Sequence, residues 1–473
     1  MEPIKFILAG QRAESDERLT IRSPYNDEVV GETFYATEAQ ALEAVRKAKA
    51  AFEVTRKMPA YQRGDILRRV SQLIKDHAEE AAQIMCGECG KAIKDCRGEV
   101  NRAVHTFLVA AEEARHLEGE YLPLDLTPGN EGKFGLVKRF PLGPVLGISP
   151  FNFPLNLVAH KIAPAIAAGN PIILKPATRT PLSALKLGEW VLEAGFPPEA
   201  ISVLPCQNNV AQMLAAHEDI AVLSFTGSDV VGWMLKEVAR KKRVLLELGG
   251  NAAVIVHSDA NIADAAVRCA RGGFYYAGQS CIAVQRLYVQ QDIAQPFLDE
   301  FVRRTQELKV GDPRREETDL GPVIDDAAAD RIERQIKEAV DGGAQLLTGG
   351  ARHGRVFEPT ILLGASHQLD VFCNEIFAPI VVVEEYDTFD EALAIANDTR
   401  FGLQAGVFTR DIGRINQAFE TLEVGGVIIN DVSNWRIDNM PYGGVKDSGQ
   451  GREGPRYSIQ EMTEPRLLVI AQS

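Results

Sequence analysis

Residues 244–256 of the chain read Val244-Leu245-Leu246-Glu247-Leu248-Gly249-Gly250-Asn251-Ala252-Ala253-Val254-Ile255-Val256. Two short apolar runs, 244–248 and 252–256, flank a turn signal that contains two glycines. A short apolar run that ends in a turn is typical of a strand buried on both faces of a parallel sheet. We therefore predict one strand on each side of Gly249-Gly250.

The same pattern continues on both sides of this stretch. Upstream, beginning at Gly143, further apolar runs occupy 145–149, 171–174 and 221–225, with helical segments at 181–194 and 231–241. Downstream we expect a helix from about Ala263, a strand around 287–289, a helix to about Leu308, and strands at 381–384, 403–408 and 427–429. This alternation predicts an α/β fold in which two doubly wound parallel-sheet domains meet near Gly249-Gly250.

The first third of the chain is predicted to be helical between short strands. Thr37-Glu38-Ala39-Gln40 fits a capping box that opens a helix running toward Phe52. A second helix is expected after Tyr61, because apolar residues recur at helical spacing. They are Ile66, Val70, Leu73 and Ile74.

Length and composition limit the class of protein. The chain has 473 residues, 45% apolar and 25% charged, which is ordinary globular composition. At about 150 residues per domain, the length corresponds to about three domains. The net charge of −14 repels phosphate backbones, so a nucleic acid is not an expected partner.

The chain is expected to be cytoplasmic and free of membrane spans. Residues 1–5 lack the basic and apolar regions of a signal peptide. The longest uncharged stretch, 141–160, carries four prolines and two asparagines, which suit no membrane helix. The seven cysteines, an odd number, therefore indicate reduced thiols rather than a disulfide framework.

Two of these cysteines, Cys86 and Cys89, form a C-x-x-C motif. They lie in a helical pattern without a second C-x-x-C, so we predict a structural role and no metal site. Cys281 differs, because it lies in Gly278-Gln279-Ser280-Cys281-Ile282-Ala283. A nearby glycine lets a substrate approach a nucleophile closely, although free cysteine is also commonly a small buried hydrophobe.

Two polar residues in apolar surroundings are further candidates. Glu247 ends an apolar strand, where burial would raise its pKa and suit it to act as a general base; the alternative is a helix-capping or ion-paired glutamate. Asn152 lies between aromatic rings and prolines in Pro150-Phe151-Asn152-Phe153-Pro154. A rigidly held amide there could donate to an oxyanion, and the alternative is a turn asparagine.

At this point the sequence resembles the aldehyde dehydrogenase superfamily over nearly the whole chain. Seven short blocks match in order and spacing. They are PFNFP at 150–154, ILKPA at 173–177, SFTGS at 224–228, LELGGN at 246–251, GQSCIA at 278–283, EIFAP at 375–379 and PYGGVKDSG at 441–449.

The resemblance implies a covalent, hydrolytic mechanism. Cys281 would attack the aldehyde as a thiolate and form a thiohemiacetal. The Asn152 amide and the Cys281 backbone N–H would stabilise its oxyanion. After hydride transfer to the cofactor, Glu247 would activate the water that hydrolyses the thioester.

The resemblance also assigns residues to NAD or NADP. Lys175 would hold the adenosine ribose, Glu375 the nicotinamide ribose, and Phe377 would pack near the nicotinamide ring. The N–H groups of 226–228 would lie by the pyrophosphate. The full set is Ser149, Pro150, Lys175, Thr178, Gly227, Ser228, Gly232, Leu248, Glu375 and Phe377. No G-x-G-x-x-G follows a strand; G-x-x-x-x-G at 227–232 fits the variant binding of the family.

The cofactor preference stays open at this stage. NAD-preferring members often carry a glutamate three residues after the lysine of KPA, and here that position is Thr178. A neutral hydroxyl removes the repulsion that a carboxylate exerts on a 2′-phosphate, which Lys175 could then pair with. NADP is therefore allowed.

The substrate pocket is only partly determined by the resemblance. Phe151, Phe153, Tyr275 and Trp435 should line the aldehyde tunnel. Arg436, if it points inward, would favour an aldehyde with a distal carboxylate, phosphate or hydroxyl, such as a small semialdehyde or hydroxyaldehyde. Arg102 is a weaker candidate for this role, and the alternative for Arg436 is a surface arginine paired with Asp438. Ser280 disfavours a phosphorylated aldehyde, because members that bind one often carry arginine there.

Two other functions compete with the hydrolytic enzyme. A CoA-acylating semialdehyde dehydrogenase usually lacks the general-base glutamate, so Glu247 argues against it. A non-catalytic protein that retains the fold is disfavoured by the joint presence of Asn152, Glu247 and Cys281.

The resemblance implies a cofactor domain, a catalytic domain and a small oligomerisation element. We expect the cofactor domain at 1–120 and 141–249, the catalytic domain at 250–440, and oligomerisation strands at 121–140 and 455–473. Exposed edge strands need pairing, so a homodimer or homotetramer is expected.

Overall fold

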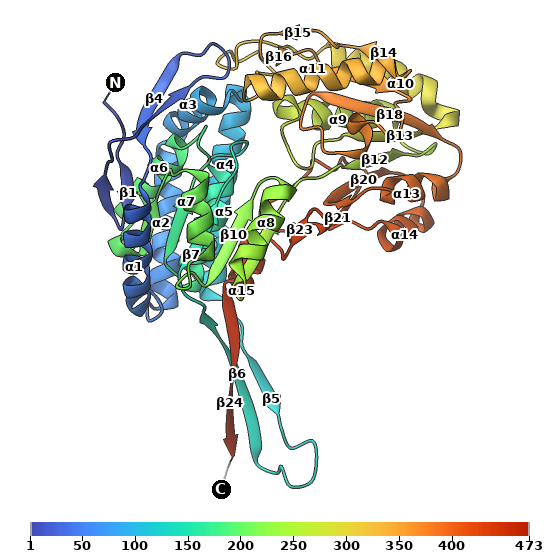
Figure 1. Cartoon of the computed structure of the whole chain (residues 1–473). Coiled ribbons are helices and arrows are strands. Elements are labelled where there is room, and N and C mark those ends of the chain that lie inside the picture. Colours follow the sequence, from blue (N-terminus) through green and yellow to red (C-terminus); the bar gives the residue numbers. More distant parts are fainter. Residues whose placement is uncertain (1, 472–473) are drawn as a thin grey trace.

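The computed structural model describes residues 2–471, in which two β-sheets lie beside each other and a narrow three-stranded arm projects from one of them (Figure 1). The chain leaves the first sheet at Glu247 and enters the second at Ala253. Gly250 lies at this crossing, and a side chain there would collide with the backbone carbonyl of Cys281. Gly250 therefore lets the junction approach the Cys281 loop closely.

The first sheet has eight strands in the order β2-β1-β9-β8-β7-β10-β11-β23. The five strands from β9 to β11 run parallel, and β1 and β23 pair antiparallel at the two sides. The order reverses between β7 and β10, where open α/β sheets bind ligands. The strands are β1 (Phe6–Leu8), β2 (Gln11–Ala13), β7 (Val145–Ile148), β8 (Ile172–Lys175), β9 (Ile201–Val203), β10 (Val222–Thr226), β11 (Arg243–Glu247) and β23 (Gly449–Gln450).

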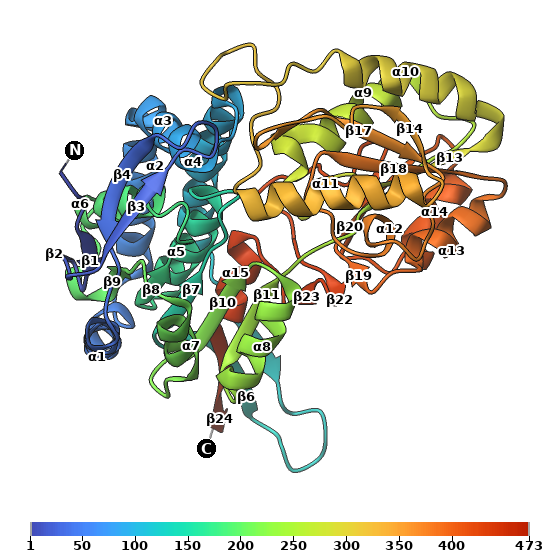
Figure 2. The ribbon, with the colours of Figure 1, turned by 45° about the horizontal axis from the view of Figure 1, so that its top comes forward.

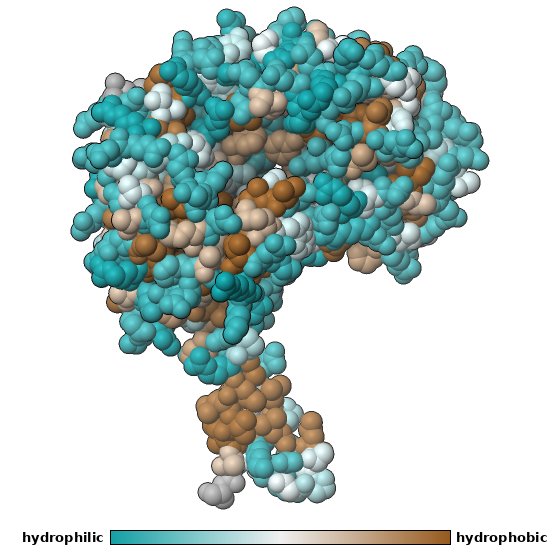
Figure 3. All heavy atoms as spheres, viewed as in Figure 1, coloured by the Kyte–Doolittle hydropathy of each residue, from teal (hydrophilic) through white to brown (hydrophobic). Residues whose placement is uncertain are grey.

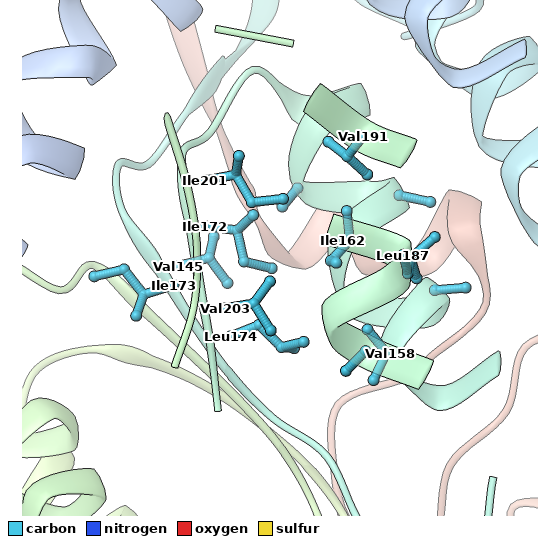
Figure 4. Packing of buried hydrophobic residues seen from close by; sticks show 14 of the residues in the cluster. Val145, Val158, Ile162, Ile172, Ile173, Leu174, Leu187, Val191, Ile201 and Val203 are labelled. Atoms are coloured by element: carbon cyan, nitrogen blue, oxygen red, sulfur yellow. The ribbon is translucent and has the colours of Figure 1, made fainter. Parts of the chain in front are cut away.

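The core of this domain packs helices against the sheet. All thirteen residues of α5 (Asn156–Ala168) are buried, as expected for a helix that is apolar on nearly every side. Figure 4 shows Val158 and Ile162 of α5 beside Leu187 and Val191 of α6 (Leu182–Glu193), next to apolar side chains of the strands. The other helices here are α1 (Glu38–Thr55), α2 (Ala60–Asp76), α3 (Ala78–Cys89), α4 (Ile93–Arg115), α7 (Asn208–Ala216) and α8 (Asp229–Ala239).

Local sequence signals placed several of these elements correctly. Thr37 caps α1 through the predicted capping box, in which its hydroxyl accepts from the Gln40 N–H. The helix predicted after Tyr61 begins at Ala60, one residue before that tyrosine. Cys86 and Cys89 lie buried in α3.

The second sheet has seven strands in the order β14-β17-β18-β13-β12-β20-β21, parallel except for β14. Helices α11, α13 and α14 cover one face, and α9 and α10 the other (Figure 2). The strands are β12 (Ala253–Val256), β13 (Arg286–Gln290), β14 (Gln345–Thr348), β17 (Thr360–Leu363), β18 (Ile380–Tyr386), β20 (Gln404–Phe408) and β21 (Gly426–Ile429). The helices are α9 (Ile262–Phe274), α10 (Ala294–Gln306), α11 (Asp326–Asp341), α12 (Asp370–Cys373), α13 (Phe389–Asn397) and α14 (Ile412–Thr421).

The projecting arm is an antiparallel sheet in the order β24-β6-β5. Its strands are β5 (Glu120–Pro123), β6 (Lys133–Pro141) and β24 (Thr463–Ala471). The expectation of strand structure throughout 455–473 is wrong at its start, because Pro455–Glu461 form helix α15 packed on α5 and α4. Residues 472–473 lie outside the described residues.

Three short antiparallel strand pairs lie outside these sheets. They are β3 (Arg18–Arg22) with β4 (Val29–Phe34), β15 (Arg352–His353) with β16 (Val356–Phe357), and β19 (Phe401–Gly402) with β22 (Val445–Lys446). Between residues 2 and 471, no helix is both long and apolar enough to cross a membrane.

Candidate active site

A cavity of about 1420 Å³ is lined by residues of both sheets. Its wall includes Asn152, Glu247 and Cys281. Asn152 lies more than ninety positions before Glu247 in the sequence. The cavity also reaches Ser149 after β7 and Thr226 at the end of β10, so it extends to the switch point of the first sheet. The three proposed catalytic residues and this switch point therefore share one cavity.

Cys281 lies in a loop that follows a strained turn. Tyr276 and Ala277 have φ values of 49° and 52°, a conformation that L-residues rarely adopt, and such strain gathers at functional sites. Burial raises the pKa of the Cys281 thiol to about 12, while a hydrogen bond with Tyr442 lowers it. The distance between Cys281 Sγ and Tyr442 Oη is 3.0 Å.

Asn152 is buried and holds the loop that carries Cys281. Its Nδ2 donates to the Gln279 carbonyl at 3.0 Å. Its Oδ1 has no hydrogen-bond partner among residues 2–471. The amide is thereby fixed two residues from the thiol, at the wall of the cavity.

Glu247 is a buried carboxylate without a partner. Neither of its oxygens is hydrogen-bonded within the described chain. Burial, and next the charge of Glu453, raise its pKa well above the ordinary value. A carboxylate whose pKa is raised is a stronger proton acceptor than an ordinary glutamate, which is the property that a general base needs.

A network of paired charges lies against these residues. Arg436 Nη2 donates to Glu453 at 2.8 Å, and its guanidinium carbon lies 3.7 Å from the ring centre of Tyr442. Arg102 donates to Asp438 through Nε at 3.2 Å and Nη2 at 2.7 Å. The alternative pairing of Arg436 with Asp438 is therefore wrong: Arg436 is buried on the cavity wall, and Arg102 is the partner of Asp438.

The cofactor side of the cavity has groups suited to a dinucleotide. Helix α8 begins at the carboxyl end of β10, and Ser228 makes no side-chain cap to it within residues 2–471, which leaves first-turn N–H groups for an anion. The buried hydroxyl of Ser149 has no partner in the same range. Burial lowers the pKa of Lys175, a cation on the same wall. These groups fit a pyrophosphate and a ribose.

Nine of the ten predicted cofactor residues line the cavity, and Gly232 does not. A side chain at Gly232 would collide with Leu248, so this glycine permits the packing of α8 on the β11 end. Glu375 accepts from the Gly250 N–H at 3.0 Å, and burial raises its pKa to about 7. Phe377 packs edge-on against Phe151, with ring centres 5.9 Å apart.

All four predicted tunnel aromatics line the cavity as well: Phe151, Phe153, Tyr275 and Trp435. Phe153 stacks on Tyr275 with ring centres 6.3 Å apart. The Lys91 ammonium lies 3.8 Å from the Phe153 ring centre and is paired with Glu99. Trp435 is 45% exposed.

Sequence reasoning missed three residues of this region: Tyr442, Glu453 and Lys161. Tyr442 stands in the block PYGGVKDSG, yet nothing in the block alone directs its hydroxyl to Cys281. Lys161 is fully buried in α5, where its Nζ donates to the Thr226 hydroxyl at 2.8 Å. Its signal was available, since a single lysine interrupts an apolar helix.

Comparison with known proteins agrees with this geometry. Residues 11–468 match the aldehyde dehydrogenase family. The chain is 42% identical over 462 residues to 3-sulfolactaldehyde dehydrogenase of Priestia megaterium, covering 98% of this chain and 96% of that protein.

Two solved structures share the fold. Aldehyde dehydrogenase 21 of Physcomitrella patens, in complex with the reaction product succinate, has a TM-score of 0.97 and 44% identity, covering 100% of this chain and 99% of the other. NADP-dependent glyceraldehyde-3-phosphate dehydrogenase of Bacillus halodurans, complexed with NADP, has a TM-score of 0.97 and 34% identity, covering 100% of both chains.

The chain belongs to the aldehyde dehydrogenase family. It is an enzyme of aldehyde oxidation that uses NAD or NADP, so the fold, the family and the reaction class predicted from the sequence are confirmed.

Proposed function

We propose that this enzyme oxidises a small aldehyde with a distal anionic or hydroxyl group to the carboxylic acid, through a cysteine thioester that water hydrolyses. The observation that carries the proposal is the meeting of Cys281, Asn152 and the unpaired Glu247 on one cavity wall. Arg102 and Arg436 line the same cavity, which supports an anionic substrate.

Each residue of the centre has a step in this proposal. Cys281 Sγ forms a bond to the aldehyde carbon, and the carbonyl electron pair moves to oxygen. Asn152 Nδ2 and the Cys281 N–H donate to that oxygen. Glu247 takes a proton from the water that attacks the thioester carbon; the C–S bond then breaks, which returns the sulfur to Cys281 and releases the carboxylic acid. A bound dinucleotide would accept the hydride that leaves the aldehyde carbon when the thiohemiacetal becomes the thioester, before water attacks.

The proposed nucleophile can be tested directly. Cys281→Ser should abolish NAD(P)H formation and leave cofactor binding intact, as followed by nucleotide fluorescence, because the hydroxyl is a far weaker nucleophile than a thiolate. Cys373→Ser, at another half-buried cysteine, is the matched control. Substantial turnover by the Cys281 variant would contradict the proposal.

We further propose a preference for NADP. Thr178 carries no charge to repel a 2′-phosphate, Lys175 lies on the same wall, and one structural relative is complexed with NADP. The remaining cofactor residues would be Ser149, Pro150, Gly227, Ser228, Leu248, Glu375 and Phe377. Measured kcat/KM values for both cofactors test this, and a strong preference for NAD would contradict it.

The proposed substrate class rests on the cavity and on the relatives. Sulfolactaldehyde, succinate and glyceraldehyde 3-phosphate, named for the three relatives, all carry an anionic group. Arg102 is the better placed arginine, because its Nη1 makes no hydrogen bond within residues 2–471 and its side chain is 29% exposed. Arg436 is buried and paired with Glu453.

A comparison of succinic semialdehyde with hexanal tests this class. Arg102→Gln should lower kcat/KM for the anionic aldehyde by about 10- to 100-fold, the value of a charge-assisted hydrogen bond, and leave hexanal unaffected. Arg69→Gln, at an exposed arginine of α2, is the matched control. An unchanged preference in Arg102→Gln would contradict the role of this residue, and acyl-CoA formation in the assay would favour the CoA-acylating alternative.

We propose that the arm pairs with a second copy of the chain in a homodimer or homotetramer. Figure 3 shows an apolar surface on the arm, to which Leu467, Leu468 and Val469 contribute with half of each side chain exposed. An exposed apolar strand of this kind is stabilised by pairing. Light scattering should give a mass of two or four chains, and a monomer would contradict this.

A further inference from the structure

The hydroxyl of Tyr442 lies 3.0 Å from Cys281 Sγ. Tyr442 is buried, and its hydroxyl makes no other hydrogen bond between residues 2 and 471. Cys281 also packs against the Tyr442 side chain in a small apolar cluster with Ile282 and Leu403. The phenol is therefore directed at the sulfur and at no other described polar group.

Two sets of contacts fix Tyr442 in this position, and Glu453 takes part in both. Its backbone exchanges both hydrogen bonds with Glu453, N–H to carbonyl at 3.0 Å and 2.6 Å. The Arg436 guanidinium covers the face of its ring at 3.7 Å from the ring centre. Glu453 holds that guanidinium with a bond of 2.8 Å. Backbone and ring are thus both held, and the hydroxyl has little freedom to turn away from Sγ.

The charges around the phenol favour donation to the sulfur. Burial raises the pKa of Tyr442 well above its ordinary value, so the hydroxyl keeps its proton. A cation on the ring face draws electron density from the phenol, which strengthens its O–H as a donor. The charged groups that face Cys281 are Glu375, Arg436 and Glu247, of which only Arg436 favours a thiolate.

We infer that Tyr442 is a further catalytic residue, whose hydroxyl donates a hydrogen bond to Cys281 Sγ and stabilises the thiolate before attack, with Arg436 as the positioning residue of that phenol. The inference rests on the proposed role of Cys281 as nucleophile. The thiol proton passes through water to Glu247, which releases it to solvent before it accepts the proton of the hydrolytic water, and Tyr442 keeps its own proton throughout. When the S–C bond forms, the sulfur loses its charge and the hydrogen bond weakens.

Alkylation of Cys281 by iodoacetamide measures this effect without a turnover assay. Tyr442→Phe removes only the hydroxyl, and a lost hydrogen bond to a charged sulfur lowers the thiolate fraction by about tenfold or more. Because a thiolate of higher pKa is a stronger nucleophile, the rate should fall by about three- to tenfold at each pH from 6.5 to 9. Peptide mass spectrometry follows Cys281, and the half-buried Cys373 serves as an internal reference that should not change. An unchanged Cys281 rate would overturn the inference.

A graded donor separates this chemistry from a packing effect. Replacement of Tyr442 by 3-fluorotyrosine keeps the size of the ring and makes the hydroxyl a stronger hydrogen-bond donor. Cys281 should then react faster with iodoacetamide than in the wild type. Arg436→Lys, which loses the planar contact with the ring, should give a rate between those of wild type and Tyr442→Phe. Equal rates for fluorotyrosine, tyrosine and phenylalanine at matched thermal midpoints would also overturn it.

The same experiment keeps the two proposals apart. In the wild type, loss of dehydrogenase activity should follow Cys281 alkylation one for one. If Cys281 is alkylated and activity persists, the proposed nucleophile is wrong. If activity follows alkylation but Tyr442→Phe leaves the rate unchanged, only the role of Tyr442 is wrong.

Discussion

Two buried glutamates on the same cavity wall, Glu247 and Glu453, have opposite surroundings. They are 5% and 3% exposed. Glu453 accepts from Arg436 and lies 4.0 Å from His160 Nδ1, and its interactions with these two side chains lower its pKa to about 2 against the effect of burial. Glu247 has no partner in the described chain, and its pKa is raised. Burial alone therefore does not determine what a carboxylate does; its partners do.

This difference indicates that Glu453 has a structural role and Glu247 a chemical one. A buried carboxylate paired with a cation holds its neighbours in place, because removal of either partner leaves a charge uncompensated. A buried carboxylate without a partner costs stability and is tolerated mainly at functional sites. Substitution of each glutamate by glutamine removes its charge and tests these two roles.

The largest effect is expected for Glu247→Gln. The amide cannot take a proton from water, so steady-state turnover should fall by about 10²- to 10⁴-fold. A first burst of NAD(P)H should survive, because hydride transfer precedes thioester hydrolysis, and rapid-mixing absorbance at 340 nm measures both phases. Glu237→Gln, at an exposed glutamate of α8, is the matched control. Loss of the burst together with turnover would assign Glu247 to an earlier step.

A smaller effect, on stability rather than chemistry, is expected for Glu453→Gln. Arg436 would keep its charge in a buried site without a counter-charge, which costs about 3 kcal/mol of unfolding free energy. Urea denaturation of Glu453→Gln, Glu247→Gln and the wild type under the same conditions measures it. If Glu247→Gln has the lower unfolding free energy of the two variants, Glu247 and not Glu453 is the glutamate with the structural role.

The sequence predicted what local patterns determine. Thr37 and Gln40 are three residues apart, and their reciprocal hydrogen bonds depend on that spacing alone. The strand runs 244–248 and 252–256 likewise follow from local apolarity. Helix α15 was missed although Pro455 at its start is a helix-initiating signal.

Contacts between distant segments could not be predicted in this way. Arg102 and Asp438 are 336 positions apart, and their pairing depends on how α4 meets the loop before Tyr442. Sequence reasoning therefore offered the near neighbour Arg436 as the alternative partner of Asp438. The role of Gly232 also depends on a contact between separate segments. The resemblance assigned it to the cofactor, whereas the packed structure shows that Leu248 lies against it.

The smallest expected effect is a difference in pH dependence between the two glutamates. The pKa of Glu247 is raised in the folded state, so the folded protein binds more protons than the unfolded chain above about pH 4.5. Its contribution to stability therefore falls as pH rises toward the folded pKa, by at most about 1.4 kcal/mol per pH unit. Glu453 behaves oppositely: its contribution is complete above about pH 4.5 and is lost as pH falls toward 2.

Thermal midpoints of wild type and Glu247→Gln between pH 5 and 8 test this contrast. The variant lacks the titrating group, so its stability relative to wild type should rise with pH across that range, by about 1 kcal/mol or more in total. The exposed-site variant Glu237→Gln should run parallel to wild type. If the thermal midpoint of Glu247→Gln instead runs parallel to that of the wild type, Glu247 is charged in the folded protein throughout this pH range. A cation or water would then compensate this carboxylate, which has no hydrogen-bond partner among the described residues.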